Sequence, residues 1–156
     1  MTASPPRDNP TRAYLADAIA QRRFGGALDV VNPALQALGT VLLDGTPGDV
    51  RIGFTAGAQM LQGNGVVSGG TLAQMLDSAM ALAALSTLAP GLTCATISLT
   101  VHMQRPAMPG PLSATAKVER AGKRVAFTVA QLFDANGKLV ASGSSSLAVV
   151  PEAEPA

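Results

Sequence analysis

One long stretch of the chain carries almost no charge. Between Arg51 and Arg105, about a third of the sequence, Asp77 is the only formally charged residue. Within this stretch, an apolar run from about Gly70 to Ala89 predicts a helix that Pro90-Gly91 ends. Because such a helix has almost no charged face, it must be covered on nearly all sides. A strongly curved sheet can cover part of it and a partner subunit the rest, so we expect a central helix in a homodimer.

Asp77 needs an explanation at this position. An ionised carboxylate buried without a partner is costly, since even a neutral polar group costs roughly 2–7 kcal/mol. Desolvation favours the neutral carboxyl group, which suits a general base, and nucleophilic attack by the carboxylate is the alternative use. A structural role, in which Gln74, Ser78 or a neighbouring chain satisfies the carboxylate, is the competing interpretation. The sequence slightly favours a functional role and does not choose between base and nucleophile.

The composition excludes several classes of function. With 11 Lys and Arg against 10 Asp and Glu, and 3% aromatic residues, the chain lacks the basic surface and stacking platforms of a nucleic-acid binder. The chain has one cysteine, Cys94, and one histidine, His102. A single cysteine excludes an internal disulfide, and so few nitrogen and sulfur ligands argue against a metal site. Polar residues interrupt the apolar run and no Lys or Arg flanks it closely, which argues against a membrane span. The proline-rich segment from Met1 to Pro10 lacks the apolar core of a signal peptide, so we expect one cytoplasmic domain behind a flexible leader.

The hydrophobic patterns predict helices early in the chain and strands late. The elements expected before the long helix are two helices, two strands of a hairpin and a glycine-rich loop, at residues 11–24, 32–38, 40–43, 50–54 and 57–70. Four strands joined by short turns are expected after it, at residues 96–103, 112–120, 125–133 and 139–150. This order predicts an α+β domain in which an antiparallel sheet packs around the long helix.

The first strand after the helix has a clear period of two. Polar residues alternate with apolar ones along it, Thr96, Ser98, Thr100 and His102 against Ile97, Leu99, Val101 and Met103. The alternation predicts one polar and one apolar face. A lone histidine on such a strand is more often a packed or surface residue than a catalyst.

The glycine-rich loop before the long helix imitates two nucleotide-binding motifs. Gly63 to Gly70 nearly matches a dinucleotide fingerprint, but the third glycine is displaced, no βαβ unit follows, and the lysine of a phosphate loop is missing. The simpler interpretation is a sharp turn into the helix with Ser68 as N-cap. The backbone N–H groups of Gly69 and Gly70 would then lie at the positive end of the helix dipole, where a polarised carbonyl is stabilised.

Gly69 and Asp77 lie too far apart on one helix to act on the same carbon atom. The eight steps along the chain from Gly69 to Asp77 span roughly 12 Å at the rise of an α-helix. If both act on one carbonyl group, they come from different subunits.

Two further groups of residues are weaker candidates. Cys94 has no nearby base or helix start that would lower its pKa, so we expect it to be inert. A cluster of basic residues surrounds one turn and consists of Lys117, Arg120, Lys123 and Arg124. Such a cluster is usually a solvent-exposed turn, but it is also able to bind phosphates.

Several motifs together resemble a known family. They are Gly65-Val66-Val67-Ser68-Gly69-Gly70, Asp77, Thr96-Ile97-Ser98-Leu99, Arg105-Pro106, Gly110, Gly122-Lys123 and Asn136-Gly137-Lys138-Leu139-Val140-Ala141. Over about Asn32 to Val150 the chain resembles hotdog-fold acyl-CoA thioesterases of the phenylacetic-acid-degradation (PaaI-like) type. The resemblance implies a leader and helix at 1–31, a hotdog domain at 32–150 and a tail at 151–156. It also implies a homodimer, with a dimer of dimers as the expected larger assembly.

The resemblance implies roles for particular residues. Asp77 matches the acidic residue that one subunit contributes to a site at the dimer interface, and the N–H of Gly69 polarises the thioester carbonyl from the opposing helix. Thr96 and Gln62 match positions that orient the attacking water. Coenzyme A is then the leaving group of the substrate, and no cofactor is implied. The expected substrate-binding residues are Ser68, Gly70, Arg120, Lys123 and Arg124.

One departure from the family pattern concerns the start of the helix. Relatives usually have His-Gly-Gly where this chain has Ser68-Gly69-Gly70. A backbone oxyanion site survives this change, but the shape of the carbonyl pocket does not follow from the family. The alternatives are therefore a hotdog module that binds acyl-CoA without hydrolysing it and, with a poorer fit, a dehydratase that pairs a histidine with the acid.

Overall fold

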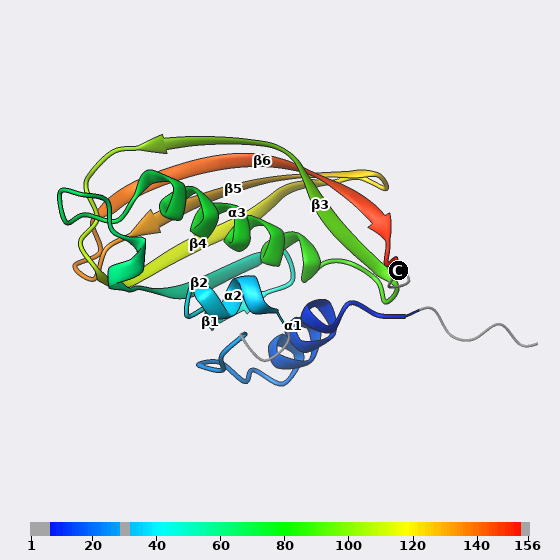
Figure 1. Ribbon diagram of the computed structural model, residues 1–156. Coiled ribbons are helices and arrows are strands. Elements are labelled where there is room, and N and C mark those ends of the chain that lie inside the picture. The colour runs from blue at the N-terminus through cyan, green and yellow to red at the C-terminus, as the bar shows by residue number, and fades with distance from the viewer. Residues whose placement is uncertain (1–6, 29–31, 154–156) are drawn as a thin grey trace, which may run out of the picture.

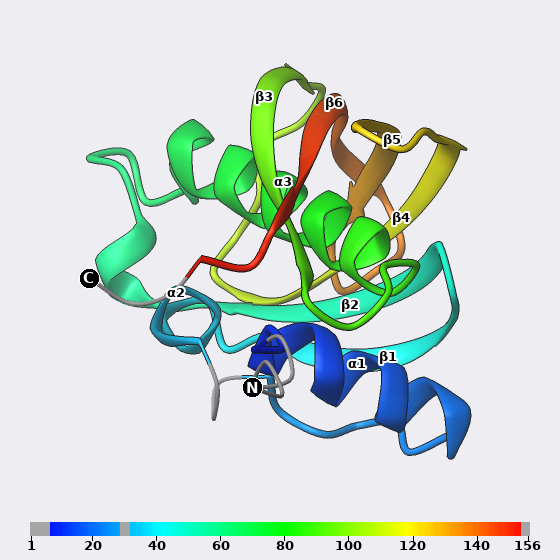
Figure 2. The ribbon, with the colours of Figure 1, turned by 90° about the vertical axis from the view of Figure 1, so that its right-hand side faces the viewer.

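The computed structural model describes residues 7–28 and 32–153, which form one antiparallel sheet curved around a long helix (Figures 1 and 2). The six strands lie in the order β1-β2-β4-β5-β6-β3, so β1 and β3 are the edges. Their bounds are β1 Val41–Thr46, β2 Asp49–Ala56, β3 Leu92–Met103, β4 Gly110–Ala121, β5 Val125–Phe133 and β6 Leu139–Pro151. The central helix is α3, Gly69–Leu85, preceded by the 3-10 helix η1, Ala58–Met60. The predicted α+β class and the sheet wrapped around the helix are confirmed.

Two short helices precede the sheet, α1 at Pro10–Ala20 and α2 at Pro33–Ala37. Both follow an asparagine whose side chain accepts hydrogen bonds from the first backbone N–H groups of the helix. The second helix agrees with the prediction. The first ends earlier than the predicted Phe24, because the chain turns at Arg22, which adopts a positive φ of 52°.

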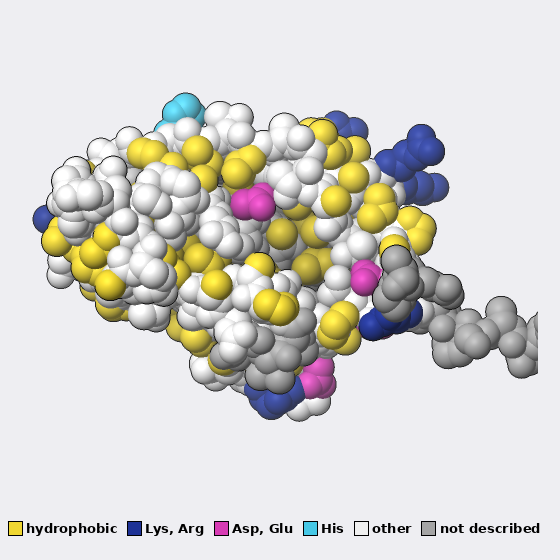
Figure 3. Space-filling view, viewed as in Figure 1, with side chains coloured by type: hydrophobic (Ala, Val, Ile, Leu, Met, Phe, Trp, Pro, Cys, Tyr) yellow, Lys and Arg dark blue, Asp and Glu magenta, His cyan; other side chains and the backbone are white. Residues whose placement is uncertain are grey.

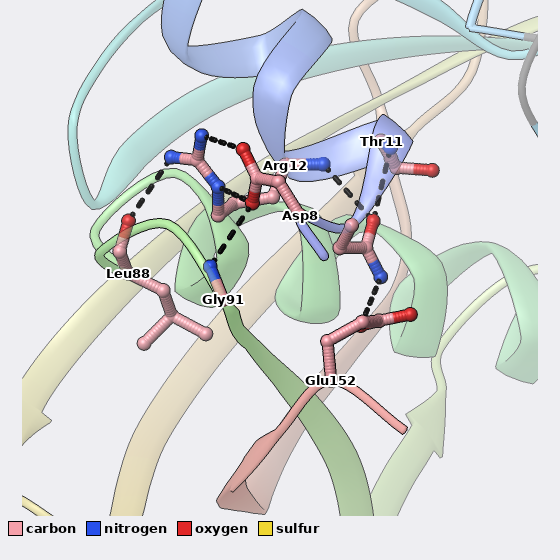
Figure 4. A network of polar contacts seen from close by, with 7 residues as sticks. Asp8, Thr11, Arg12, Leu88, Gly91 and Glu152 are labelled. Carbon is pink, nitrogen blue, oxygen red and sulfur yellow. Dashed lines mark hydrogen bonds and ion pairs between the residues drawn. The ribbon is translucent and has the colours of Figure 1, made fainter. Parts of the chain in front are cut away.

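The start of α1 is attached to the turn between α3 and β3 (Figure 4). Arg12 is 8% exposed, forms an ion pair with Asp8 and donates to the carbonyl of Leu88 at 3.2 Å. Asp8 also accepts a hydrogen bond from the N–H of Gly91 at 3.3 Å. The hydrogen bond from Arg12 is the main reason that the pKa of Asp8 lies below its ordinary value.

We expect Asp8→Asn to lower the free energy of unfolding by about 1–3 kcal/mol, because the buried guanidinium group loses its charged partner. Since the pKa of Asp8 is lower in the folded chain, this stabilisation is present above the ordinary carboxyl pKa and is lost as the pH falls through the folded value. Urea unfolding at neutral pH and at about pH 3 measures both effects. Asp17→Asn is the control, because its ion pair with Arg23 is half-exposed and should contribute little. Equal losses in the two variants would contradict the prediction.

The helix α3 ends at Leu85, before the predicted stop at Pro90. The hydroxyl groups of Ser86 and Thr87 each donate to a backbone carbonyl three residues earlier, both at 2.7 Å. These bonds satisfy carbonyl groups that the end of a helix leaves without partners. Local side-chain bonding therefore ends the helix before the proline is reached.

The sheet covers most of α3 and leaves one face of the helix partly exposed. This open stripe consists of Gly70, Gln74, Asp77 and Ala81, whose spacing places them on one side of the helix. Asp77 is therefore half-buried, and the expectation of a fully buried carboxylate is wrong for the single chain. The carboxylate lies on the side of the helix that the sheet of its own chain leaves uncovered.

The strand β3 departs from the predicted alternation at a β-bulge between Thr96 and Ser98. Thr96 faces α3, whereas Ser98 bonds to Ser146 at 2.7 Å on the other side of the sheet. The residue between them, Ile97, is 60% exposed. The prediction that Thr96 and Ser98 share a polar face is wrong, because a bulge inserts one residue into the period of two.

Parts of two predicted segments lie outside the described residues. The predicted leader falls mainly on residues 1–6, and the predicted tail includes residues 154–156. At the described end of the chain, the N–H of Glu152 donates to the carbonyl of Gly91 at 2.9 Å. Within residues 7–28 and 32–153, no helix has both the length and the hydropathy that crossing a membrane requires.

Candidate active site

Asp77 and Thr96 form a polar pair on the open stripe. Thr96 Oγ1 donates to Asp77 Oδ1 at 2.8 Å. The bulge in β3 makes this contact possible, because it turns the hydroxyl group toward the helix. Gln74 and Ser78, the structural partners considered from the sequence, do not bond to the carboxylate, and its Oδ2 has no partner among the described residues. The pair therefore presents an oriented carboxylate with one free oxygen, which is able to accept a proton from water.

The first turn of α3 presents unpaired backbone donors. Ser68 is the N-cap, as predicted, and its Oγ accepts from the N–H of Thr71 at 3.3 Å. The N–H groups of Gly69 and Gly70 have no acceptor within the described part of the chain, and both residues are exposed. A carbonyl oxygen that develops negative charge is stabilised by such donors at the positive end of a helix.

A pocket of about 310 Å³ lies beside Gly69. One wall is the loop that contains Gln62, and the other is the chain from Met103 to Pro106. A hydrogen bond of 2.8 Å from the N–H of Val67 to the carbonyl of Ala107 joins the two walls. Met103 Cε lies 3.9 Å from the place that a Cβ atom on Gly69 would take. Gln62 and Gly69, which the sequence assigned to one site, thus line the same pocket.

The structure separates Gly69 from Asp77 within one chain. They are eight helical steps apart, which is roughly 12 Å. Asp77 is not among the residues that line the pocket beside Gly69. The candidate residues therefore form two groups, Asp77 with Thr96 and Gln62 with Gly69.

The basic residues Arg120, Lys123 and Arg124 lie at the turn between β4 and β5, at the opposite end of the sheet from the start of α3 (Figure 1). The strand β4 begins four residues after Pro106 and leads the chain away from the pocket over twelve residues. Figure 3 shows Lys and Arg side chains gathered at that end, whereas the surface over α3 and β3 is mainly hydrophobic or uncharged. The basic cluster does not contribute to the pocket of its own chain.

His102 lies on the opposite side of the sheet from Asp77. Its neighbour Val101 packs against the core, and Met103 lies at the start of α3. Alternation along the strand then places His102 on the outer face, where it lines a hollow with Lys117 and Gln131. The pairing of a histidine with Asp77 that a dehydratase would require does not occur within this chain.

Cys94 lies close to the carboxylate of Asp77. Burial, with a smaller contribution from the negative charge of Asp77, raises the pKa of the Cys94 thiol to about 11. Its Sγ donates to the carbonyl of Ala81 at 3.8 Å. A thiol with a raised pKa is a poor nucleophile at neutral pH, which agrees with the expectation of an inert cysteine.

We expect the alkylation rate of Cys94 by iodoacetamide to rise with a midpoint near pH 11 in the folded protein, against about 8.5 in the unfolded chain. Because the folded pKa is raised, the stabilisation from the neutral thiol is complete below about pH 8.5 and is lost as the pH rises through about 11. Asp77→Asn removes a negative charge and should lower the midpoint, whereas Glu119→Gln, a distant change of the same kind, should not. A folded-state midpoint at the unfolded value would contradict this prediction.

The sequence did not identify Met103 and Arg105 as pocket residues. Both line the pocket because the chain after β3 folds back beside the loop before α3. The sequence contained one indication of the position of Arg105. It is the charged residue that ends the long uncharged stretch, so it lies next to the apolar region in the chain. The contact between Thr96 and Asp77 had no sequence signal, because it depends on the bulge.

The geometry agrees with what comparisons with known proteins find. The family model described as the thioesterase superfamily matches residues 64–141. A solved structure of a thioesterase-superfamily protein is 30% identical, with 90% of this chain and 98% of that chain covered and a TM-score of 0.69. The chain therefore belongs to the thioesterase superfamily, which makes it a thioester hydrolase, and its fold is the hotdog fold.

Two other similar structures refine this placement. A phenylacetic acid degradation-related protein from Ralstonia eutropha JMP134 is 29% identical, with 86% of this chain and 98% of that chain covered and a TM-score of 0.73. The PaaI protein of the phenylacetic acid degradation operon of E. coli is 27% identical, with 88% and 94% covered and a TM-score of 0.74. A search of curated proteins finds no match. The resemblance to PaaI-like hotdog thioesterases is confirmed.

Proposed function

We propose that the protein hydrolyses the thioester of an aryl- or medium-chain acyl-CoA to the free acid and coenzyme A. The observation that carries the proposal is an oriented carboxylate, Asp77 bonded to Thr96, on the same helix as the free N–H group of Gly69. The names of two similar structures refer to phenylacetic acid degradation, which supports an aryl substrate. The pocket volume of about 310 Å³ is near the lower end of the usual range for small-molecule sites, which also supports a compact acyl group.

In this proposal a second subunit completes the site. The strand β3 is an edge of the sheet, and its side chains Ile97, Leu99 and Met103 are 60%, 37% and 43% exposed. An exposed edge of this kind, next to the open stripe of α3, is suited to pairing with β3 of a second copy. The two-fold arrangement would bring Asp77 of each subunit toward Gly69 of the other, which resolves the separation of roughly 12 Å along one helix.

The proposed reaction uses these groups in sequence. The carbonyl oxygen of the thioester accepts a hydrogen bond from the N–H of Gly69. Asp77 of the partner subunit takes a proton from a water molecule while the water oxygen bonds to the carbonyl carbon. The C–S bond then breaks, and the proton passes to the thiolate of coenzyme A. Direct attack by the carboxylate, through an anhydride that water hydrolyses, is the alternative course with the same groups.

The remaining candidate residues have supporting roles in the proposal. Thr96 fixes the carboxylate, and Gln62 lies in the pocket where it is able to orient water. Ser68 starts the helix with a side chain smaller than the histidine of relatives. A side chain on Gly70 would meet nothing within 4 Å, so the approach to the helix start is open there.

The basic turn is assigned to the phosphates of coenzyme A. Arg120, Lys123 and Arg124 are exposed and lie far from Gly69 of their own chain. We therefore assign them to the site that uses the partner's Gly69. The long pantetheine arm separates the phosphates from the thioester, so the two binding regions need not be adjacent.

Release of the coenzyme A thiol from a panel of aryl, medium-chain and long-chain acyl-CoAs tests the proposed function. We expect turnover of the aryl or medium-chain substrates by the full chain. Binding of these acyl-CoAs without any turnover would instead support a non-catalytic binding module. A solution mass equal to one chain would contradict the shared site.

A further inference from the structure

The pocket beside Gly69 contains a single charged side chain. Its apolar lining comes from Val66, Val67, Leu72, Met103 and Pro106, and Arg105 is the only Lys, Arg, Asp or Glu that lines it. The amide side chains of Gln62, Asn64 and Gln104 complete the lining, so a group bound there meets apolar walls, neutral amides and one guanidinium group. The apolar walls suit the hydrocarbon part of an acyl group, and the guanidinium group adds a charge that a purely hydrocarbon acyl group does not use.

The backbone at Arg105 is held firmly. The N–H groups of Gln104 and Arg105 both donate to the carbonyl of Val140, at 2.9 and 3.1 Å. Pro106 follows directly and fixes its own φ. The side chain of Arg105 therefore starts from a defined position at the mouth of the pocket.

The guanidinium group of Arg105 is available to a ligand. The ion pairs found across residues 7–28 and 32–153 are Asp8 with Arg12 and Asp17 with Arg23, and neither involves the pocket. Arg105 is exposed. A planar guanidinium group binds a carboxylate through two parallel hydrogen bonds, so its natural partner is an anionic group of the substrate.

The position of Arg105 favours the acyl end of the substrate over the phosphates of coenzyme A. Met103 Cε lies 3.9 Å from the Cβ place on Gly69, and Arg105 follows two residues later, about 7 Å of extended chain. A thioester carbonyl bound at Gly69 therefore has Arg105 within reach of a short acyl chain. The phosphates lie beyond the pantetheine arm and have other basic residues to meet.

We propose that Arg105 makes the site selective for acyl groups that carry a carboxylate at their distal end, that is, for monothioesters of short dicarboxylic acids. The inference rests on the proposed thioesterase function and names a specificity-determining residue for it. The carboxylate binds the guanidinium group, the apolar walls hold the methylene groups, and the thioester carbonyl lies at Gly69.

Matched substrate pairs test this inference. Adipyl-CoA and hexanoyl-CoA have acyl chains of the same length and differ only in the distal carboxylate. The ratio of their kcat/KM values therefore measures the response to that carboxylate. We expect the native chain to prefer adipyl-CoA, and Arg105→Met to reduce that preference by a factor on the order of 10–100, the loss of a charge-assisted hydrogen bond. Arg105→Lys should retain part of the preference, because it keeps the charge and loses the planar fork. Arg51→Met, a removal of charge outside this pocket, is the control.

The outcomes separate this inference from the proposed function. Hydrolysis of hexanoyl-CoA together with an unchanged preference in Arg105→Met would overturn the role of Arg105 alone. Failure of the native chain to hydrolyse any thioester would overturn the proposed function. Pantetheine thioesters, which lack the nucleotide phosphates, complete the test. If Arg105→Met weakens all coenzyme A thioesters equally but no pantetheine thioester, Arg105 binds a phosphate and the inference is wrong.

Discussion

Asp77→Asn should lower kcat/KM for the preferred acyl-CoA by about 10²–10⁴-fold, the usual contribution of a general base. Asparagine has nearly the same shape, and its carbonyl oxygen is able to accept the hydrogen bond that Thr96 donates to Asp77 Oδ1. It is unable to accept the proton of the attacking water. The loss should therefore appear mainly in kcat, and the unfolding transition should change little, because Asp77 is half-buried and uses a single hydrogen bond.

The matched control for this variant is Glu119→Gln, which removes one negative charge from an exposed position on β4. Its activity should remain that of the native chain. Thr96→Val tests the orientation of the carboxylate, since it removes the hydroxyl donor and keeps the branched side chain. We expect a loss smaller than that of Asp77→Asn. Undiminished turnover in Asp77→Asn would exclude both the base and the nucleophile roles.

The fold was predictable because its strongest determinants are local in the sequence. The uncharged stretch around Asp77 predicts a covered helix, and Ser68 before two glycines predicts where that helix starts. The late strands follow from period-two alternation and short turns. Their pairing is antiparallel throughout, as neighbouring strands joined by tight turns require. These patterns depend on a few adjacent residues, so no tertiary information was needed to read them.

The site was less predictable because it depends on irregular features. The bulge beside Ile97 has no signal in the alternation, yet it turns Thr96 toward Asp77. The early end of α3 depends on the hydroxyl groups of Ser86 and Thr87, whose bonds to nearby carbonyls compete with the helix, whereas the hydrophobic pattern continues to Ala89. The pocket beside Gly69 joins residues that are far apart in the sequence. The assignment of roles to Thr96 and Gln62 came from the family resemblance, and physical pattern alone placed Thr96 on the wrong face.

Gly69→Pro should reduce kcat by about 10²–10³-fold, the usual cost of losing one oxyanion donor. Gly69 is the first residue of α3, a position where proline is favoured and where its N–H group has no acceptor within the described residues. The preceding residue, Ser68, has φ −65° and ψ 147°, which is the conformation that proline requires before it. The substitution therefore removes the donor, and the backbone at this position already has the conformation that proline requires, so the helix should be retained.

Gly69→Ala is the control for the proline variant, because it adds a side chain and keeps the N–H group. The new Cβ would meet only Met103 Cε, at an ordinary distance of 3.9 Å. Activity in Gly69→Ala should stay well above that of Gly69→Pro when both retain the native unfolding transition. Similar activity in the two variants would exclude the N–H of Gly69 as the carbonyl donor.

Mixing the two inactive variants tests whether each site is shared between subunits. In a heterodimer of Asp77→Asn and Gly69→Pro, one shared site has the native Gly69 and the native Asp77, and the other has both substitutions. Random exchange of subunits would produce heterodimers in about half of the dimers, each with one working site, so activity should recover to about a quarter of the native value. If Gly69 and Asp77 of the same chain formed the site, every site in the mixture would carry one substitution and no activity would return. Heterodimers that form and remain inactive would thus exclude the shared site, whereas recovery would require that the carbonyl donor and the carboxylate come from different chains.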